Sequence, residues 1–305
     1  MPKKYLAHFC LLLVALFYGG NYSIAKLVLD PGHIGPNGFI ALRVACGSVA
    51  FWLLHRFFVR EKIERRDIGR IVLCAMLGVV INMLFFFQGL KLTTPINAAL
   101  LMTTVPILVL LTSSFLLKER ITLKKLLGIA VGATGAVILI IYGNKFAYRT
   151  STLLGDLMVF ANAVSYGFYI VLMKQLTRKY HPLTIVKWIF PIGLIILLPV
   201  GWQDLQAVSW STLPPVVWFS IGYVLLLATV GTYALNPYAL SILSASTVSI
   251  YIYLQPLFAA VISISLAQEE FHWTKATAAA CIFFGVYLVS SNRRTPTSTT
   301  HFEKK

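Results

Sequence analysis

The sequence predicts an all-α polytopic membrane protein with ten transmembrane helices, built as two inverted repeats of five helices each. Its composition and a repeat at an offset near 150 positions predict this fold. Hydrophobic residues occupy 58% of the 305 positions, only 12% are charged, and the mean hydropathy is +0.80. A soluble chain is about one-quarter charged, so the composition excludes a soluble globular domain.

Ten apolar segments are long enough, or nearly so, for a membrane-spanning helix, which takes roughly 20 residues. The loops between them are shorter than the roughly 50 residues of the smallest soluble domains, so one membrane unit is expected. The segments are residues 9–28, 39–54, 70–90, 98–117, 123–142, 153–173, 183–200, 214–235, 246–267 and 275–291.

The net charge of +16 follows from where the basic residues lie. With the N-terminus placed in the cytoplasm, 20 of the 26 Lys and Arg residues fall on the cytoplasmic side, five fall outside, and Arg43 lies within a span. Cytoplasmic loops of membrane proteins carry such an excess. The bias predicts that both termini are cytoplasmic. It also explains the net charge by the orientation of the chain in the lipid bilayer, so no nucleic-acid partner is needed.

Two related blocks of sequence carry the repeat, VPILVLLTSSFLLKERITLKK and QPLFAAVISISLAQEEFHWTK. An offset of 150 sets Pro106 on Pro256 and Glu119 on Glu269. A fixed-period similarity of this kind indicates duplicated structural units.

The first and sixth segments align at an offset of 148, which sets Tyr18 on Tyr166. The second and seventh segments match poorly, because Arg43 then falls on Ile189. The similarity between the halves is therefore uneven.

The repeat predicts two halves, residues 5–143 and 152–292, followed by a disordered cytoplasmic tail at 293–305. Five spans is an odd number, so the second half enters the membrane from the opposite side. Inverted repeats of this kind commonly hold a substrate near the midplane between the halves. Duplication kept only for packing is the alternative.

The two repeated prolines lie inside apolar segments. Each would free a backbone carbonyl four residues earlier, that of Met102 for Pro106 and that of Ile252 for Pro256. One interpretation is a hinge or polar notch that faces a central cavity. The other is a tolerated kink, since proline is fairly common in membrane helices.

Glu119 and Glu269 follow these prolines by 13 residues, about 20 Å along a helix. This spacing places both at the membrane surface, on opposite sides. Each can cap the next helix, and Glu119 can also pair with Arg120 or Lys124. A proton-carrying role is the alternative, although a relay carboxylate should lie deeper.

Amides, phenols and aromatic rings form stripes at helical spacing on five of the spans. Such polar groups are costly within a membrane unless they face a cavity or one another. Packing between helices explains a single one of them, whereas five stripes together predict a shared substrate cavity. The predicted cavity residues are Tyr18, Asn21, Asn82, Phe86, Asn162, Tyr166, Tyr169, Tyr233, Asn236, Tyr251 and Gln255.

Two basic residues lie within or close to the predicted spans. Arg43 is about one turn from the outer end of its segment, where it can snorkel outward or hold an anionic group or a carbonyl. Lys187 presents the same choice near the inner end of the seventh segment.

Small residues recur every four positions in GIAVGATGA, at Gly128, Gly132 and Ala136. This spacing predicts close contact between two helices, either within one chain or across a homodimer.

Several chemistries leave no trace in the sequence. It contains no G-x-x-x-x-G-K-[ST] loop for ATP, no H-E-x-x-H and no acidic metal cluster, which are the signatures of nucleotide and zinc sites. We therefore expect no cofactor, no metal and no enzymatic activity.

The order and duplication of these features resemble the drug/metabolite transporter superfamily, and within it the EamA-type permeases. The motifs that carry the resemblance are YGGNYS, PNGFIALR and the two copies of the block with its Pro and Glu, and together they cover roughly residues 5–291. One departure is that the second copy has QEE where the first has KER, so a shared role for the two acidic ends is not expected.

The resemblance implies a central cavity lined mainly by the first, third, fourth, sixth, eighth and ninth helices. It also implies a location in the bacterial inner membrane and a small-molecule substrate. We expect a secondary transporter that exports small metabolites, such as amino acids or amphipathic drugs, by alternating access. The alternatives are a passive channel or facilitator and a non-transporting membrane scaffold.

Overall fold

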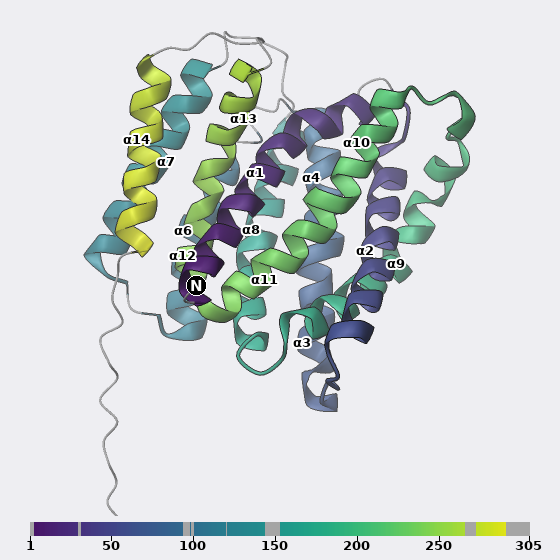
Figure 1. The fold of residues 1–305 in the computed structure, drawn as a ribbon, viewed down its shortest axis with the longest axis horizontal. Coiled ribbons are helices and arrows are strands. Elements are labelled where there is room, and N and C mark those ends of the chain that lie inside the picture. Colours follow the sequence, from purple (N-terminus) through teal and green to yellow (C-terminus); the bar gives the residue numbers. More distant parts are fainter. Residues whose placement is uncertain are drawn as a thin grey trace, which may run out of the picture.

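The structure, a computed structural model, describes residues 3–29, 32–93, 98, 101–119, 121–143, 153–265 and 273–290. This part of the chain consists of helices joined by short connections and contains no strand (Figure 1). Five of the described helical segments are long and apolar enough to cross a membrane: Pro36–Phe58, Arg65–Leu92, Leu153–Leu176, Pro182–Gln206 and Pro215–Ile242. The predicted fold class, an all-α polytopic membrane protein, is confirmed.

The first half of the chain ends with α7. Its elements are α1 (Lys3–Leu29), α2 (Pro36–Phe58), the short helix η1 (Arg65–Asp67), α3 (Ile68–Ala75), the π-helix η2 (Met76–Val80), α4 (Ile81–Leu92), α6 (Val105–Leu117) and α7 (Leu123–Gly143). The third span thus runs through η1, α3, η2 and α4 without a loop.

The second half begins with α8. Its elements are α8 (Leu153–Leu176), α9 (Pro182–Gln206), η3 (Trp210–Thr212), α10 (Pro215–Leu225), the π-helix η4 (Leu226–Gly231), α11 (Thr232–Ile242), α12 (Ala245–Ser249), η5 (Ile250–Tyr253), α13 (Leu254–Ser265) and α14 (Trp273–Ser290).

One interpretation of the sequence expected the repeated prolines to kink helices from within. The structure instead places each proline in the first turn of an α-helix. Pro106 is the second residue of α6, which follows a turn at residues 103–104, and Pro256 is the third residue of α13, which follows the 3₁₀-helix η5. Proline suits the first turn of a helix, because its missing N–H would have no intrahelical partner there. A turn thus interrupts the fourth span before its proline, whereas the ninth span changes from a 3₁₀-helix to an α-helix without a loop.

Two π-helices occupy equivalent positions in the halves. η2 and η4 begin 150 positions apart, the offset of the sequence repeat. A π-helix is rare and widens one turn of a span, so its presence in both third-position spans marks a shared structural feature.

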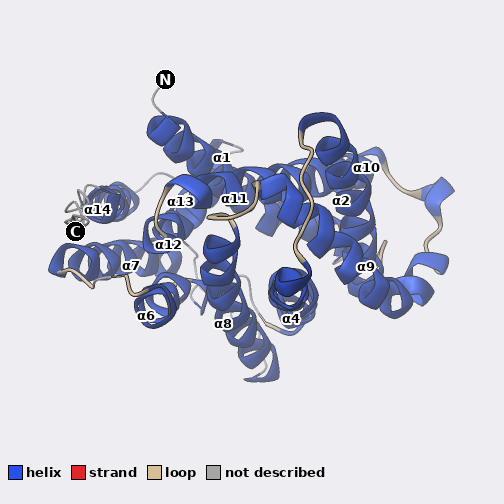
Figure 2. Cartoon of the chain, turned by 90° about the horizontal axis from the view of Figure 1, so that it is seen from below, coloured by secondary structure: helices blue, strands red, loops and turns tan. Residues whose placement is uncertain are grey.

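The outermost helices pair closely (Figure 2), α7 against α14 and α2 against α9. A Cβ atom added to Gly285 would lie 2.6 Å from the carbonyl oxygen of Gly128. The glycines thus let the α7 and α14 backbones approach. Contact within one chain accounts for the small-residue face, and a homodimer stays a prediction.

Candidate substrate cavity

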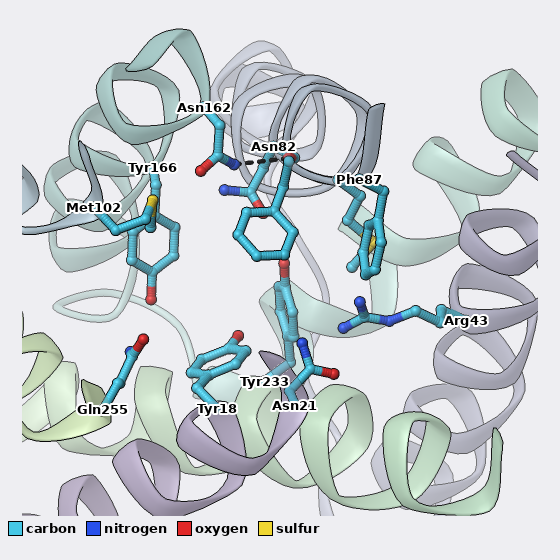
Figure 3. Close-up of a pocket in the computed structure, with 12 residues that line it drawn as sticks. Tyr18, Asn21, Arg43, Asn82, Phe87, Met102, Asn162, Tyr166, Tyr233 and Gln255 are labelled. Carbon is cyan, nitrogen blue, oxygen red and sulfur yellow. Dashed lines mark hydrogen bonds between the residues drawn. The ribbon is translucent and has the colours of Figure 1, made fainter. Parts of the chain in front are cut away.

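A cavity lies between the two halves (Figure 3), lined by side chains of α1, α2, α4, α8, α11 and α13 together with Met102. The cavity has a volume of about 60 Å³, which is small beside the roughly 300–1,000 Å³ of typical ligand pockets. In this conformation the cavity is a narrow, partly polar space.

Eight of the eleven predicted cavity residues line this space: Tyr18, Asn21, Asn82, Phe86, Asn162, Tyr166, Tyr233 and Gln255. They come from both halves, as the repeat predicted. The other lining residues are Arg43, Met83, Phe87 and Met102. The second helix therefore contributes as well, through Arg43, in addition to the helices that the resemblance implied.

Tyr169 lies outside the cavity, contrary to its assignment to the α8 stripe. Its ring packs against η2, where a Cβ on Gly78 would lie 2.2 Å from a ring carbon, and it stacks on Tyr166 with 5.9 Å between ring centroids. Because Gly78 has no side chain, the third span approaches α8 closely and the ring fills the contact between helices.

Asn236 and Tyr251 also lie outside the main cavity, beside a smaller one that shares Tyr166 and Gln255 as walls. Asn236 Nδ2 donates to the Tyr166 hydroxyl at 2.8 Å, and the Tyr251 hydroxyl is 2.7 Å from His8 Nδ1. Tyr251 belongs to the 3₁₀-helix η5, where each residue turns about 120° around the axis instead of the roughly 100° that the α-helical pattern assumes.

Arg43 places a guanidinium at one end of the cavity. Its Nε donates to Thr229 Oγ1 at 2.9 Å and its Nη2 donates to the Ala228 carbonyl at 3.3 Å. The guanidinium carbon lies 5.0 Å from the centre of the Phe87 ring. The side chain is only 3% exposed, so of the two alternatives Arg43 holds a carbonyl and does not snorkel.

The π-helices supply the carbonyls for contacts between the halves. η4 presents the Ala228 carbonyl to Arg43 of the first half. η2 presents the Leu77 and Gly78 carbonyls to Ser165 and Tyr233 of the second half, each at 2.6 Å. The widened turns therefore hold cavity-lining side chains in place.

Two amide oxygens in the cavity lining have no hydrogen-bond partner among the described residues, Asn21 Oδ1 and Asn162 Oδ1. Their side chains are 4% and 1% exposed. Asn162 uses its Nδ2 to donate to the Asn82 carbonyl at 2.7 Å (Figure 3). A buried acceptor without a donor is costly, so these oxygens suit a donor that enters the cavity.

Glu119 does cap a helix, but not the next one. Its Oε1 accepts from the Ala245 backbone N–H at 3.2 Å, and its Oε2 accepts from Ser246 Oγ at 2.9 Å, both on α12 of the second half. Among the described residues its ion pair is with Lys125 at 2.9 Å and not with Lys124, whereas Arg120 lies outside the described residues. Lys118, at φ 53°, ends α6 in the left-handed conformation and so turns Glu119 away from the helix.

Of the remaining predicted charged positions, Lys187 does not line the cavity. Lys187 Nζ lies 3.3 Å from His55 Nδ1 and 5.7 Å from the centre of the Trp188 ring, which ties α9 to α2. Glu269 lies outside the described residues. Among the residues that the structure describes, no group of three or more His, Cys, Asp or Glu could hold a metal ion.

Met83, Phe87 and Met102 were missed because apolar side chains in a span usually indicate packing alone. Phe86 and Phe87 are adjacent residues of α4, which follows the π-helix η2, and both line the cavity. Met102 lies just before the break that precedes Pro106. The sequence signalled neither change of helix type.

Comparisons with known proteins agree with this arrangement. The model of the EamA-like transporter family matches residues 5–141 and again residues 153–291. A protein of Archaeoglobus fulgidus described as an "Uncharacterized transporter" is 26% identical over 289 residues, which cover 94% of this chain and 98% of that protein. A "Probable terminal-alkyne amino-acid exporter" of Streptantibioticus cattleyicolor is 26% identical over 193 residues, 63% of each protein.

A solved crystal structure of a protein shares the fold. It superposes with a TM-score of 0.73 over 92% of this chain and 98% of that chain, at 17% sequence identity.

Proposed function

Because this chain belongs to the EamA-like transporter family, we propose that it is a secondary transporter that exports small metabolites by alternating access. The cavity between the halves carries this proposal. It gathers amides, phenols and one guanidinium among apolar membrane helices, where polar groups are costly unless they serve a pathway or one another. The chain is an integral membrane protein, and we place it in the bacterial inner membrane with both termini in the cytoplasm.

Cross-half contacts at both ends of the molecule support alternating access. In the loops with the most basic residues, Lys179 Nζ lies 2.5 Å from Asp67 Oδ2, and the Tyr180 hydroxyl donates to the same oxygen at 2.7 Å. At the opposite end, Thr93 Oγ1 donates to Asp156 Oδ1. With contacts between the halves at both ends and a cavity of only about 60 Å³ between them, this conformation fits an occluded state.

Amino acids and amphipathic drugs are the substrate classes that the cavity suits. Its amides can hydrogen-bond to a polar group, and its rings offer apolar contact. The relative named as a terminal-alkyne amino-acid exporter supports amino acids and the outward direction. Transport needs no cofactor in this scheme, and we assign the chain no catalytic role.

Transport by purified protein in liposomes tests the proposal. We expect saturable movement of at least one labelled amino acid or amphipathic drug, accelerated by unlabelled substrate on the far side. A passive channel would instead show unsaturable flux without such counter-transport. A membrane scaffold would show no flux at all from folded protein.

A matched pair of variants ties the transport to the cavity. Tyr166→Ala removes a ring that lines it, whereas Tyr287→Ala makes the same change on a side chain that is 65% exposed on α14. We expect the first to abolish transport and the second to leave it unchanged. Equal rates in both would exclude this cavity as the pathway.

A further inference from the structure

We propose that Arg43 binds a carboxylate of the transported molecule, so that the cavity takes small carboxylates, and α-amino acids in particular, in one fixed orientation. This inference rests on the proposed transport function. It assigns the charge-bearing end of the cavity to the acid group and the end near Met102 and Tyr166 to the rest of the molecule (Figure 3).

The first observation is that Arg43 is a buried cation with neutral partners. A guanidinium stays protonated in proteins and has five N–H donors. Two of its nitrogens donate to the Thr229 hydroxyl and the Ala228 carbonyl, and no ion pair among the described residues includes Arg43. A buried charge is costly unless an opposite charge compensates it.

The protein's own carboxylates are engaged elsewhere. The six that the structure describes each accept a hydrogen bond or ion pair from a group other than Arg43. They are Glu61, Glu64, Asp67, Glu119, Asp156 and Asp204. The last two lie near helix ends, where Asp156 bonds to Thr93 and Asp204 accepts from the Gly38 backbone N–H. None of the described carboxylates therefore pairs with Arg43, and a carboxylate of the cargo would suit it.

The guanidinium is held in position before any cargo arrives. Thr229 accepts from its Nε and itself donates to the Val224 carbonyl at 2.8 Å, and the Phe87 ring lies on its other side at 5.0 Å. Figure 3 shows the guanidinium pointing toward the centre of the cavity. A planar group fixed in this way matches the two oxygens of a carboxylate, and its fixed position lowers the entropic cost of binding.

A second observation points to an ammonium group on the same molecule. Asn21 is 4% exposed and lines the same cavity as Arg43, and its Oδ1 has no partner among the described residues. Asn162 Oδ1 is a second acceptor of this kind in the cavity. An α-amino acid carries a donor next to its carboxylate, so it can satisfy Arg43 and one of these amide oxygens together.

Binding by the purified full-length protein in detergent tests the proposal. The probes are the twenty common amino acids and a set of short hydroxy and keto acids, each compared with its own primary amide by calorimetry. We expect each acid that binds to do so at least about tenfold more tightly than its amide, because only the acid forms a charge-assisted pair with Arg43. Absence of binding by every acid, or equal binding of acid and amide, would overturn the proposal.

Variants at Arg43 distinguish recognition from a structural role. Arg43→Gln should bind an acid and its amide equally, with the acid weakened and the amide little changed, and Arg43→Lys should discriminate only in part. A structural role alone predicts that acid and amide weaken by the same factor. Arg56→Gln is the matched control, because it makes the same change on an exposed residue of α2 and should keep the full discrimination.

Two further measurements keep the test decisive. If Arg43→Gln does not fold, Thr229→Val leaves the charge but removes the acceptor of its Nε, and acid discrimination should fall at least about threefold; unchanged discrimination would overturn the proposal. Liposome transport separates this inference from the proposed function. Acid-selective binding without transport removes the transporter proposal alone, whereas transport that treats acid and amide alike removes the Arg43 proposal alone.

Discussion

The third span of the chain, in the first half, and the eighth span, in the second half, are built alike. In each, a π-helix interrupts an α-helical span, and the two π-helices begin 150 positions apart. Each also offers a carbonyl to the opposite half, Gly78 to the Tyr233 hydroxyl and Ala228 to Arg43. Duplication has thus preserved a local distortion together with its use in joining the halves.

The second and seventh spans differ, although α2 and α9 pack against each other. The first half has Arg43 at the cavity, and the position aligned with it in the second half is Ile189, which is completely buried among apolar neighbours. Both halves thus contribute aligned residues such as Tyr18 and Tyr166 to the cavity, whereas the unmatched Arg43 gives it a charged end. Changes that affect the halves unequally test this interpretation.

Removing Glu119 should have the largest effect on stability, because this carboxylate joins the first half to α12 of the second. Glu119→Ala leaves Lys125, whose side chain is 9% exposed, without its ion pair and leaves the Ala245 N–H uncapped. We expect a loss of about 3 kcal/mol in the free energy of unfolding, measured by denaturation in detergent.

The matched control for Glu119 is Glu64→Ala, which removes a carboxylate with 47% exposure from a surface ion pair. It should have a much smaller effect on unfolding, because an exposed ion pair contributes little to stability. Equal losses in the two variants would mean that Glu119 is not a special connection between the halves.

Gly78→Ala should have the next largest effect, and it tests the asymmetry between the π-helices directly. The second half has Ala228 at the equivalent position, but in the first half a Cβ on Gly78 would lie 2.2 Å from the Tyr169 ring. We expect destabilisation of about 2 kcal/mol, measured by the same denaturation.

Gly69→Ala is the control for Gly78, since nothing lies within 4 Å of a Cβ added there. It should leave stability unchanged or raise it by up to about 1 kcal/mol. If Gly78→Ala were equally harmless, the close approach of η2 to Tyr169 would not be a constraint on the fold.

The parts of the cavity that the sequence predicted are those with regular helical geometry around them. Tyr18 and Asn21 on α1, and Asn162 and Tyr166 on α8, line the cavity because polar groups on one α-helical face must share a polar environment. The duplicated segments also indicated that both halves would contribute.

The failures occur where the backbone changes helix type. Tyr251 was assigned by an α-helical spacing that η5 does not have, and Phe87 was missed because an apolar ring in a span usually indicates packing alone. Tyr169 lies outside the cavity because its ring packs on Gly78, which is 91 positions away in the sequence. Each depends on contacts between distant segments, which a single-helix pattern does not contain.

Tyr233→Phe should have a moderate effect that distinguishes a π-helix contact from an ordinary one. It removes the hydroxyl that donates to the Gly78 carbonyl of η2 at 2.6 Å. Tyr223→Phe is matched to it, because its hydroxyl donates to the Phe17 carbonyl of an α-helix at 3.0 Å. Each should lower the free energy of unfolding by about 1 kcal/mol.

Hydrogen exchange then separates the two tyrosines. Only Tyr233→Phe should speed amide exchange around η2, because only its hydroxyl holds that widened turn. Faster exchange around η2 in both variants, or in neither, would mean that this cross-half bond does not stabilise the π-helix.

The smallest expected effect concerns pH, at the loops that join the halves outside the spans. Lys179 donates to Glu64, and Arg66 Nε lies 2.5 Å from Glu64 Oε2. These contacts lower the pKa of the Glu64 carboxyl below its ordinary value. A lowered pKa means that the contribution to stability is present above the pKa of the unfolded chain, about 4.3. It is lost as the pH falls through the lower pKa of the folded protein.

Glu64→Gln should therefore lower the unfolding midpoint slightly at pH 7 and leave it equal to that of the unmodified protein at a pH below the lowered pKa of Glu64 in the folded protein, where both side chains are neutral. Asp67 binds the same Lys179 and stays intact in this variant, so the remaining acid sensitivity reports the other cross-half pair. A difference between the two proteins that grew toward low pH would have the opposite sign and would show that the Lys179–Glu64 contact does not favour the ionised carboxylate. It would also leave Asp67 as the carboxylate of these loops that joins the first half to the second through Lys179.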